Sequence, residues 1–213
     1  MGATPCTRSD RELLAAWRGG EREAGNELFA RHFRAVFRFF SSKLGAVAED
    51  LTQKTFMGLL ESAGVEVQSF RGYLFGIAKN QLYMHLRQRE RDARFFDPDS
   101  WSLHDLGLAP LRAAAADEDQ RAIEAALQTL PLDHRVTLEL FYWEGLGVAE
   151  VAEALGVAVG TVKARLARAR SNLRATLERA NVSPAVRDRV SGDLERWLRA
   201  GPAAHKRGDD GDE

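Results

Sequence analysis

VAEVAEALGVAVGTVKARLARARSNLRATLE, residues 148–178, contains two helical patterns on either side of Gly156. In the first pattern, apolar residues recur at the i, i+3, i+4 and i+7 spacing of an amphipathic helix: Val148, Val151, Ala152 and Leu155. The second pattern carries a longer apolar stripe: Val162, Leu166, Ala169, Leu173 and Leu177. Two short helices joined at a glycine form a helix-turn-helix, in which the first helix braces the second. The stretch therefore predicts a helical domain built around this unit.

The second of these helices is strongly cationic. Between residues 160 and 179, Glu178 is the one acid among six cations: Lys163, Arg165, Arg168, Arg170, Arg174 and Arg179. Arginine and lysine are good helix formers, so an ordinary solvated helix face is one interpretation. A solvated face usually mixes acids with bases, however, and the major groove of DNA admits a braced helix of this kind. The asymmetry favours contact with DNA.

The faces of this helix have different expected roles. At about 100° per residue, three positions point away from the apolar stripe: Thr161, Ala164 and Arg168. The remaining cations lie on the flanks: Lys163, Arg170 and Arg174 on one side and Arg165 on the other. We expect the outer face to meet base edges and the flanks to meet phosphates.

The chain as a whole is not attracted to polyanions, because its 213 residues carry a formal net charge of −1. Affinity for DNA has to come from local patches. A second basic patch lies within residues 79–94, where five cations accompany Glu90 and Asp92: Lys79, Arg87, Arg89, Arg91 and Arg94.

Several classes of protein are disfavoured. One cysteine, Cys6, cannot form an internal disulfide, and no Cys/His cluster has zinc spacing. No GxxxxGK[ST], HExxH or GxSxG motif is present, and the five histidines are scattered. No apolar run reaches the length of a membrane span, and the start lacks the regions of a signal peptide. We expect no metal, no cofactor, no catalytic residue and no membrane insertion, with the cytoplasm as the compartment.

Helical periodicity recurs along nearly the whole chain, and strand-type alternation is almost absent. FDPDSWSLHDLGLAP, residues 96–110, lacks clear periodicity and predicts a linker. We expect an all-α fold of two small helical domains. The expected division is a first domain at 1–94, a linker at 95–117, a helix-turn-helix domain at 118–180, and a C-terminal extension at 181–213 with a short amphipathic helix and an acidic tail.

Within the first domain, Asp10 is the expected N-cap of a helix that ends before Gly19. A longer helix near residues 26–44 carries a wide apolar stripe that we expect in the core: Phe29, Phe33, Val36, Phe37, Phe40 and Leu44. Further helices are expected near 47–62 and 70–94.

Two faces of the first domain are hard to explain by packing. The helix near 47–62 carries a polar face, for which a solvated surface is the alternative: Asp50, Gln53, Lys54 and Met57. The helix near 70–94 mixes an aromatic ring and an amide with cations: Lys79, Asn80, Tyr83, Arg87, Arg89 and Arg91. Rings stack on unpaired bases while cations hold phosphates, so this helix suits single-stranded nucleic acid. Core packing is the expected role of its early residues Tyr73, Leu74 and Ile77.

EDLTQKTFMGLLES, residues 49–62, and FRGYLFGIAKNQLYMHLRQRER, residues 70–91, resemble the second conserved region of bacterial sigma factors of the extracytoplasmic-function group. LPLDHRVTLELFYWEGLGVAEVAEALGVAVGTVKARLARARSNLR, residues 130–174, resembles the fourth region. The two regions and their linker cover most of residues 10–180. The resemblance implies a sigma factor that binds core RNA polymerase and directs it to specific promoters. It also makes an anti-sigma factor a candidate partner.

The resemblance further implies residue roles. The face with Asp50 and Gln53 matches the family's docking surface for the clamp coiled coil of the polymerase. Asn80 matches a position of the segment that recognises the −10 element, and residues 63–70 match the loop that holds a flipped base. Four cations of the helix that follows Gly156 match the helix that recognises the −35 element: Lys163, Arg165, Arg168 and Arg170.

The chain departs from the family where polar residues are common: Gly147, Ala158, Ala164 and Met84. These departures remove polar contacts and bear on the promoter sequence, not on the fold. A free-standing helix-turn-helix regulator, which would bind duplex DNA without polymerase, is the alternative function. A recombinase is a further alternative, but it needs a nucleophile or metal-binding carboxylates that the sequence does not supply.

Overall fold

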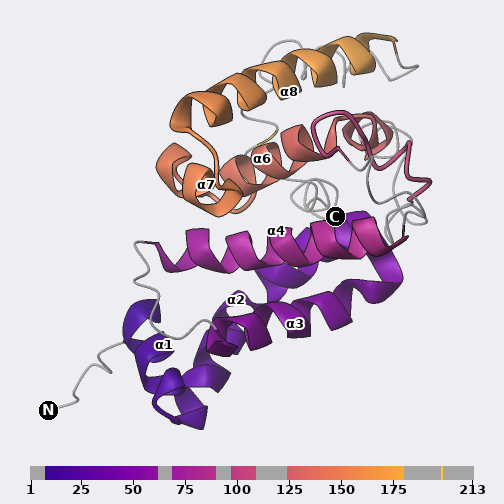
Figure 1. Ribbon diagram of the computed structural model, residues 1–213. Coiled ribbons are helices and arrows are strands. Elements are labelled where there is room, and N and C mark those ends of the chain that lie inside the picture. Colours follow the sequence, from indigo (N-terminus) through magenta and orange to yellow (C-terminus); the bar gives the residue numbers. More distant parts are fainter. Residues whose placement is uncertain (1–7, 62–68, 90–96, 109–123, 180–197, 199–213) are drawn as a thin grey trace, which may run out of the picture.

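The computed structural model describes residues 8–61, 69–89, 97–108, 124–179 and 198, and the fold within them is helical (Figure 1). The first domain holds α1 to α4: Asp10–Arg18, Arg22–Leu44, Ala48–Glu61 and Phe70–Arg89. The second domain holds α6, α7 and α8: Leu132–Tyr142, Val148–Leu155 and Val159–Arg179. The described ranges contain no named strand, and an isolated bridge joins Ser102 to Pro131. The predicted all-α fold of two helical domains is confirmed.

Helix α1 begins with Ser9 as its N-cap. The Ser9 hydroxyl accepts a hydrogen bond from the Glu12 N–H at 3.3 Å, and the Glu12 carboxylate accepts one from the Ser9 N–H at 2.7 Å. This reciprocal pair satisfies N–H groups that a helix start leaves unpaired. Asp10 is the first helical residue, and its carboxylate pairs with Arg31 and His32 of α2, both at 2.8 Å. The prediction of Asp10 as the cap is therefore wrong, because its side chain connects α1 to α2.

The apolar stripe of α2 lies only partly in the hydrophobic core. Val36, Phe40 and Leu44 are buried as predicted, whereas Phe29 is 40% exposed. Near its N-terminus α2 packs against α1, and the Phe29 ring lies beside that of Phe56 in α3 with centroids 4.8 Å apart. The prediction of core packing is thus wrong for Phe29, which lies at the surface between two helices.

Residues 97–108 pack against the second domain. The Leu132 N–H donates to the Trp101 carbonyl at 2.8 Å, and the Asp133 N–H donates to the Pro98 carbonyl at 3.0 Å. These bonds satisfy two N–H groups at the start of α6 that have no acceptor within the helix. The described part of the expected linker is therefore fixed on the second domain.

The predicted helix-turn-helix is present as α7 and α8. Gly156 ends α7 with a φ of 68°, a left-handed conformation that a side chain makes costly. The predicted apolar stripe of α8 is buried along its whole length: Val162, Leu166, Ala169, Leu173 and Leu177. Since α8 packs against both α6 and α7, the stripe fixes which face of α8 points outward.

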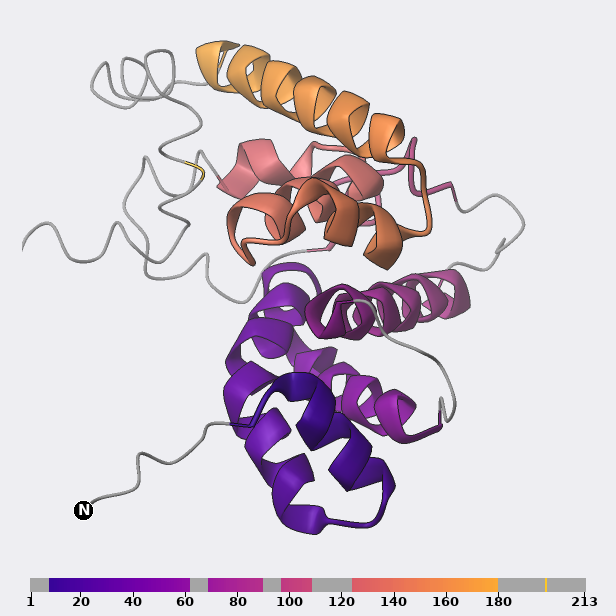
Figure 2. The ribbon, with the colours of Figure 1, turned by 90° about the vertical axis from the view of Figure 1, so that its left-hand side faces the viewer.

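Helix α4 of the first domain lies against α7 of the second (Figure 1 and Figure 2). Two glycines one turn apart on α4 permit this contact. A Cβ atom on Gly72 would lie 3.2 Å from the Glu150 carbonyl oxygen, and one on Gly76 would lie 3.3 Å from the Ala154 carbonyl oxygen. Both distances are tighter than the 3.4–4 Å of an ordinary van der Waals contact of a Cβ atom, and the atom met is backbone in each case. A side chain at either position would therefore push the two helices apart.

Replacing both glycines with leucine is expected to separate the domains in solution. Leucine at these positions cannot fit against the backbone of α7, whereas the core of each domain stays intact. Small-angle X-ray scattering should give a larger radius of gyration for Gly72→Leu/Gly76→Leu, with unchanged helical circular dichroism. Gly160→Leu is the control, because a Cβ atom there meets nothing within 4 Å. An unchanged radius in the double variant would contradict the role of the glycines.

Candidate nucleic-acid interface

The outer face of α8 is open to solvent. The three positions predicted to lie opposite the apolar stripe are exposed, and so are two flanking cations: Thr161, Ala164, Arg168, Lys163 and Arg174. Arg170 is half-buried, and its guanidinium donates to the Tyr142 hydroxyl at 3.0 Å. No acid lies in the first turn of α8. The face combines small side chains with cations, which suits a helix that enters the major groove.

Arg165 differs from the other cations of α8 because it is only 7% exposed. Its guanidinium pairs with the Asp133 carboxylate at 2.5 Å and with both carboxylate oxygens of Asp99 at 2.9 and 3.0 Å. Asp133 lies in the first turn of α6, and Asp99 lies in the packed segment 97–108. The sequence predicts an accessible flank position for Arg165, but the structure buries it against two carboxylates. Its contact with DNA stays a prediction.

A shallow hollow of about 530 Å³ lies along α4. Its lining includes four of the predicted nucleic-acid contacts together with Met84 and Gln88: Lys79, Asn80, Tyr83 and Arg87. Arg89 is exposed at the end of α4. Arg91 lies outside the described residues, as does most of the loop expected to hold a flipped base. The structure thus brings most of the predicted α4 residues together on one surface.

Two residues of this hollow contact the second domain. The Tyr83 hydroxyl donates a hydrogen bond to the Asp133 carboxylate, and the Lys79 ammonium donates to the Leu155 carbonyl at 3.3 Å. Burial, reinforced by Asp133, raises the pKa of Tyr83 well above its ordinary value. Burial also raises the pKa of Asp133, although the Tyr83 hydrogen bond and the Arg165 charge oppose it. Tyr83 therefore acts as a neutral donor.

The polar face of α3 is accessible, as the sequence predicts. Asp50, Gln53, Lys54 and Met57 are all exposed. Asp50 and Lys54 form an ion pair at 2.7 Å across one helical turn, which is worth little at such an exposed position. Met57 is 52% exposed, so a large apolar side chain stands in water. The face is available to a partner.

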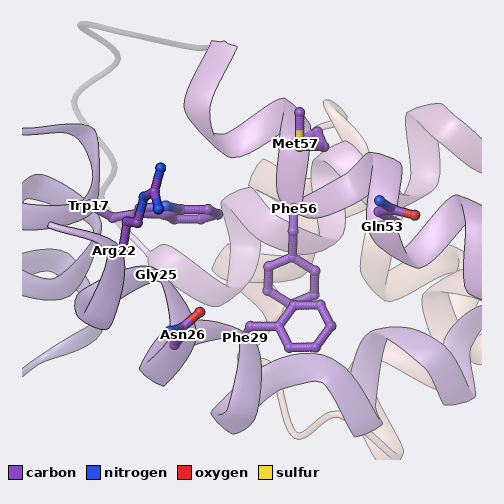
Figure 3. A pocket seen from close by; sticks show the side chains of 8 residues that line it. All are labelled: Trp17, Arg22, Gly25, Asn26, Phe29, Gln53, Phe56 and Met57. Atoms are coloured by element: carbon purple, nitrogen blue, oxygen red, sulfur yellow. The ribbon is translucent and has the colours of Figure 1, made fainter. Parts of the chain in front are cut away.

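Gln53 and Met57 also line a groove of about 340 Å³ (Figure 3). The sequence pattern does not predict the other residues that line it. The further lining residues come from α1, α2 and α3: Trp17, Arg22, Gly25, Asn26, Phe29 and Phe56. A Cβ atom on Gly25 would lie 2.4 Å from the Trp17 Nε1, so glycine is needed for the indole to lie against α2. The large aromatic residues were visible in the sequence, but only the fold places them beside α3.

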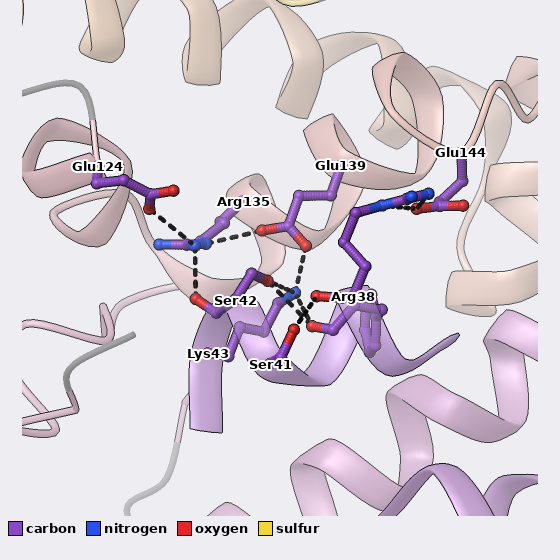
Figure 4. Close-up of polar contacts among 9 residues, drawn as sticks. Arg38, Ser41, Ser42, Lys43, Glu124, Arg135, Glu139 and Glu144 are labelled. Atoms are coloured by element: carbon purple, nitrogen blue, oxygen red, sulfur yellow. Dashed lines mark hydrogen bonds and ion pairs between the residues drawn. The ribbon is translucent and has the colours of Figure 1, made fainter. Parts of the chain in front are cut away.

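Buried charges join the two domains (Figure 4). Lys43 of α2 is fully buried, forms an ion pair with Glu139 of α6, and donates to the Phe39 carbonyl at 2.6 Å. Arg135, also fully buried, donates to the Glu139 carboxylate at 2.8 Å and to the Ser42 carbonyl at 2.9 Å. Burial lowers the pKa of Lys43 to about 8, although Glu139 favours its charged form. One carboxylate thus serves two buried cations, one from each domain.

A second set of polar contacts between the domains lies around the start of α7. The Glu144 carboxylate accepts from Arg38 of α2 at 2.6 Å. The Ser69 hydroxyl donates to the Glu150 carboxylate at 2.5 Å, and Glu150 also accepts from the Gly147 N–H at 2.8 Å. The Glu150 carboxylate therefore connects Ser69 of the first domain to the Gly147 N–H at the start of α7, where glycine supplies no capping side chain.

Within the described ranges, no set of three or more His, Cys, Asp or Glu side chains is placed to hold a metal ion. Among the helices of these ranges, none has the length and hydropathy of a membrane span.

Two family models match the chain. The model for Sigma-70 region 2 matches residues 28–92, and the model for Sigma-70 region 4 matches residues 120–173. The ECF RNA polymerase sigma factor SigM of Mycobacterium tuberculosis is 32% identical over 188 residues, which cover 84% of this chain and 90% of that protein. The chain belongs to the extracytoplasmic-function group of RNA polymerase sigma factors. The RNA polymerase sigma-H factor of Pseudomonas aeruginosa is 33% identical over 189 residues, with 79% and 94% of the two chains covered.

This sigma factor also resembles two solved structures at 26% identity. One is the sigma factor RpoE in complex with the anti-sigma factor NepR from Bartonella quintana, with a TM-score of 0.56 over 73% of this chain and 98% of that chain. The other is CnrH in complex with the cytosolic domain of CnrY, with a TM-score of 0.57 over 79% and 97%. The comparisons confirm the predicted family and do not favour the free-standing regulator.

Glu139→Gln is expected to destabilise this sigma factor by about 3 kcal/mol, because Lys43 would stay buried without its carboxylate and Arg135 would keep only the Glu124 carboxylate, 3.9 Å away. The urea midpoint, followed by circular dichroism, measures the effect. Asp50→Asn is the matched control, since it breaks an exposed ion pair and should change stability by less than about 0.5 kcal/mol. Equal urea midpoints for Glu139→Gln and Asp50→Asn would contradict the role of Glu139 as the charged partner of the two buried cations.

Proposed function

We propose that this sigma factor docks on core RNA polymerase through α3 and the adjoining groove, and that it places the enzyme on promoters through α4 and α8. The presence of both sigma regions on one chain carries this function, because each region by itself would suit a simpler DNA-binding protein. In this proposal residues 1–94 form the polymerase-binding and −10 domain, and residues 118–180 form the −35 domain.

The docking role of α3 is supported by the character of its surface. A groove with Met57 and Phe29 partly in water offers apolar contact area, and Gln53 and Asn26 at its edge offer hydrogen bonds. Protein interfaces commonly combine an apolar centre with a polar rim in this way. The groove extends the expected docking face from α3 onto α1 and α2.

The hollow along α4 suits the melted strand of a promoter. Tyr83 offers a ring for stacking, Asn80 offers an amide to a base edge, and Arg87 offers a charge to a phosphate. In the conformation described here Tyr83 and Lys79 also donate hydrogen bonds to the second domain, so a strand that binds these two side chains competes with Asp133 and the Leu155 carbonyl for them.

The outer face of α8 suits the upstream duplex. Thr161 and Ala164 are short enough to let the helix backbone approach base edges, while Lys163 and Arg168 stand in solvent beside them. Phosphate contacts from a flank cation such as Lys163 fix position, and the outer face, which includes Arg168, supplies specificity. Ala164, where a polar residue is common in the family, supplies a methyl group in place of a hydrogen bond.

The remaining assignments follow from the family. We assign the chain no catalytic activity of its own, since sigma factors are transcription initiation factors. We place it in the cytoplasm, with the polymerase and the promoter. Because the two similar structures each contain an anti-sigma factor or a cytosolic partner domain, we assign this chain a regulatory partner of the same kind. The C-terminal extension lies outside the described residues except for Leu198, which is fully buried, and its regulatory role stays a prediction.

In vitro transcription tests the function: the purified chain with bacterial core polymerase should initiate at discrete promoters, mapped by sequencing the transcripts.

Gln53→Ala/Met57→Ala should weaken polymerase binding about 10- to 100-fold, the effect of losing one or two central interface side chains. Titration of the labelled chain with core polymerase measures this. Glu178→Ala, at the far end of α8, is the control. No promoter-specific initiation by the parent chain would refute the function, whereas normal binding by the double variant would refute only the docking site.

Arg168→Ala is expected to weaken binding of the holoenzyme to the upstream duplex and to reduce the slope of log affinity against log salt by about one, if the side chain meets a phosphate. Fluorescence anisotropy over a salt series, on a promoter found by the transcription assay, measures the slope. Arg34→Ala removes an exposed cation from α2 and is the charge-matched control. An affinity and a slope both equal to those of the control would remove Arg168 from the interface.

A further inference from the structure

A hollow of about 530 Å³ lies on the face of α8 that the sequence predicts to meet base edges. The three positions opposite the apolar stripe all line it: Thr161, Ala164 and Arg168. Two further lining residues come from outside α8, since Asp99 belongs to the packed segment 97–108 and His134 to the first turn of α6. The surface offered to the duplex is therefore wider than the helix-turn-helix itself.

Asp99 and Arg168 are the accessible charged groups of this hollow. The Asp99 side chain is 55% exposed and Arg168 is exposed, whereas Arg165 is buried. Burial lowers the pKa of His134 below its ordinary value, so its imidazole carries no charge at neutral pH. Ala164 supplies only a methyl group where the family commonly has a polar residue. A carboxylate from outside α8 thus stands where α8 itself lacks a polar side chain.

The Asp99 carboxylate is held in place from several sides. The preceding residue, Pro98, accepts a hydrogen bond from the Asp133 N–H at 3.0 Å, which fixes the backbone on α6. The Asp99 N–H donates to the Asp97 carboxylate at 3.1 Å. The Arg165 guanidinium donates to both Asp99 oxygens, at 2.9 and 3.0 Å. An acceptor fixed in this way loses little conformational freedom when it binds a ligand.

The same contacts make an acid compatible with a DNA groove. A lone carboxylate would be repelled by the phosphates. Here Arg165 and Arg168 supply two positive charges, and Arg165 pairs with both Asp99 and Asp133, so two cations balance two carboxylates. Each carboxylate oxygen has two lone-pair sites, and the single donor from Arg165 leaves sites unfilled. Asp99 can therefore accept a further hydrogen bond from the open side of the hollow.

The chemistry of a carboxylate selects among the four bases. It accepts hydrogen bonds and donates none, so the acceptors that guanine and thymine present in the major groove repel it. Adenine offers its N6 amino group beside the acceptor N7, whereas cytosine offers its N4 amino group without an acceptor of its own. A fixed carboxylate on this face therefore favours cytosine.

We propose that Asp99 is a specificity-determining residue of the duplex-binding surface: its carboxylate accepts a hydrogen bond from the N4 amino group of a cytosine in the upstream promoter element. Arg165 is a positioning residue that holds this carboxylate. The proposal rests on the proposed function, because it requires the outer face of α8 to enter the major groove. Segment 97–108 then belongs, in function as in packing, to the domain that recognises the duplex.

The test measures base preference rather than affinity alone. The holoenzyme selects from a duplex library in which the upstream element of a promoter found by the transcription assay is randomised, and the bound DNA is sequenced. At one position the parent should prefer cytosine about 10-fold, the effect of one hydrogen bond to a charged group. Asp99→Ala should lose the preference at that position alone. Asp99→Asn should shift it to adenine, because an amide pairs with both N6 and N7.

Two further variants separate reading from general effects. Arg165→Ala should weaken the cytosine preference and keep cytosine as the best base, because the carboxylate is present but no longer held. Glu178→Gln makes the matching change from carboxylate to amide at the exposed far end of α8 and should alter no base preference. Circular dichroism of each variant checks that the helical fold is kept. Fluorescence anisotropy on single duplexes confirms the preferences that the selection gives.

Four outcomes would overturn the proposal or part of it. If both Asp99 variants keep every base preference of the parent, segment 97–108 does not read the duplex, and the proposal fails while the sigma function stands. If Asp99→Ala tightens binding to all sequences equally, the carboxylate acts through repulsion alone, and its reading role is wrong. If Arg165→Ala weakens binding to all duplexes and lowers the salt slope by about one, Arg165 contacts a phosphate and does not position Asp99. If the parent holoenzyme shows no promoter-specific initiation, the proposed function fails and this proposal with it.

Discussion

The close approach of α4 and α7 depends on the absence of side chains at Gly72 and Gly76. With the helices this near, the start of α6 and the end of α7 come within reach of polar groups on the first domain. Several contacts far apart in sequence follow from that one constraint: Tyr83 with Asp133, Lys79 with Leu155, Ser69 with Glu150 and Lys43 with Glu139. The two glycines thus set the close separation of α4 and α7 in which these contacts are seen.

The interface between the domains is rich in buried charged groups, and this chemistry suits a contact that can open. Buried ion pairs such as Lys43 with Glu139 give little net stability, because removal of the charges from water costs about as much as their attraction returns. They do specify one arrangement, since a shifted register would leave Arg135 or Lys43 buried without Glu139. When the domains separate, these groups regain water, and the opened surface is polar. An apolar interface of the same size would be harder to open and would expose surface prone to aggregation.

Local periodicity was enough to predict much of the second domain. The stripe of α8 is buried as predicted, because it repeats at the helical period and depends on no distant residue. Arg165 lies on the same helix, yet its burial depends on Asp99 and Asp133, far away in sequence, which periodicity cannot place. At the first helix both Ser9 and Asp10 are suitable caps. The spacing of Ser9 to Glu12 was visible, whereas the pairing of Asp10 with α2 was not.

The contact between the two domains leaves the candidate surfaces of α3 and α4 accessible to different degrees. Helix α3 lies on the side of α4 away from α7 (Figure 1). Gln53 and Met57 are exposed with the domains in contact. The hollow along α4, in contrast, has Tyr83 and Lys79 bonded to the second domain. A protein partner can therefore reach α3 without separation of the domains, whereas a ligand that takes up Tyr83 and Lys79 has to compete with their hydrogen bonds to the second domain. A partner that contacts α3 alone binds the closed and the separated arrangements equally well, so a partner can favour separation only through surfaces that the contact between the domains covers.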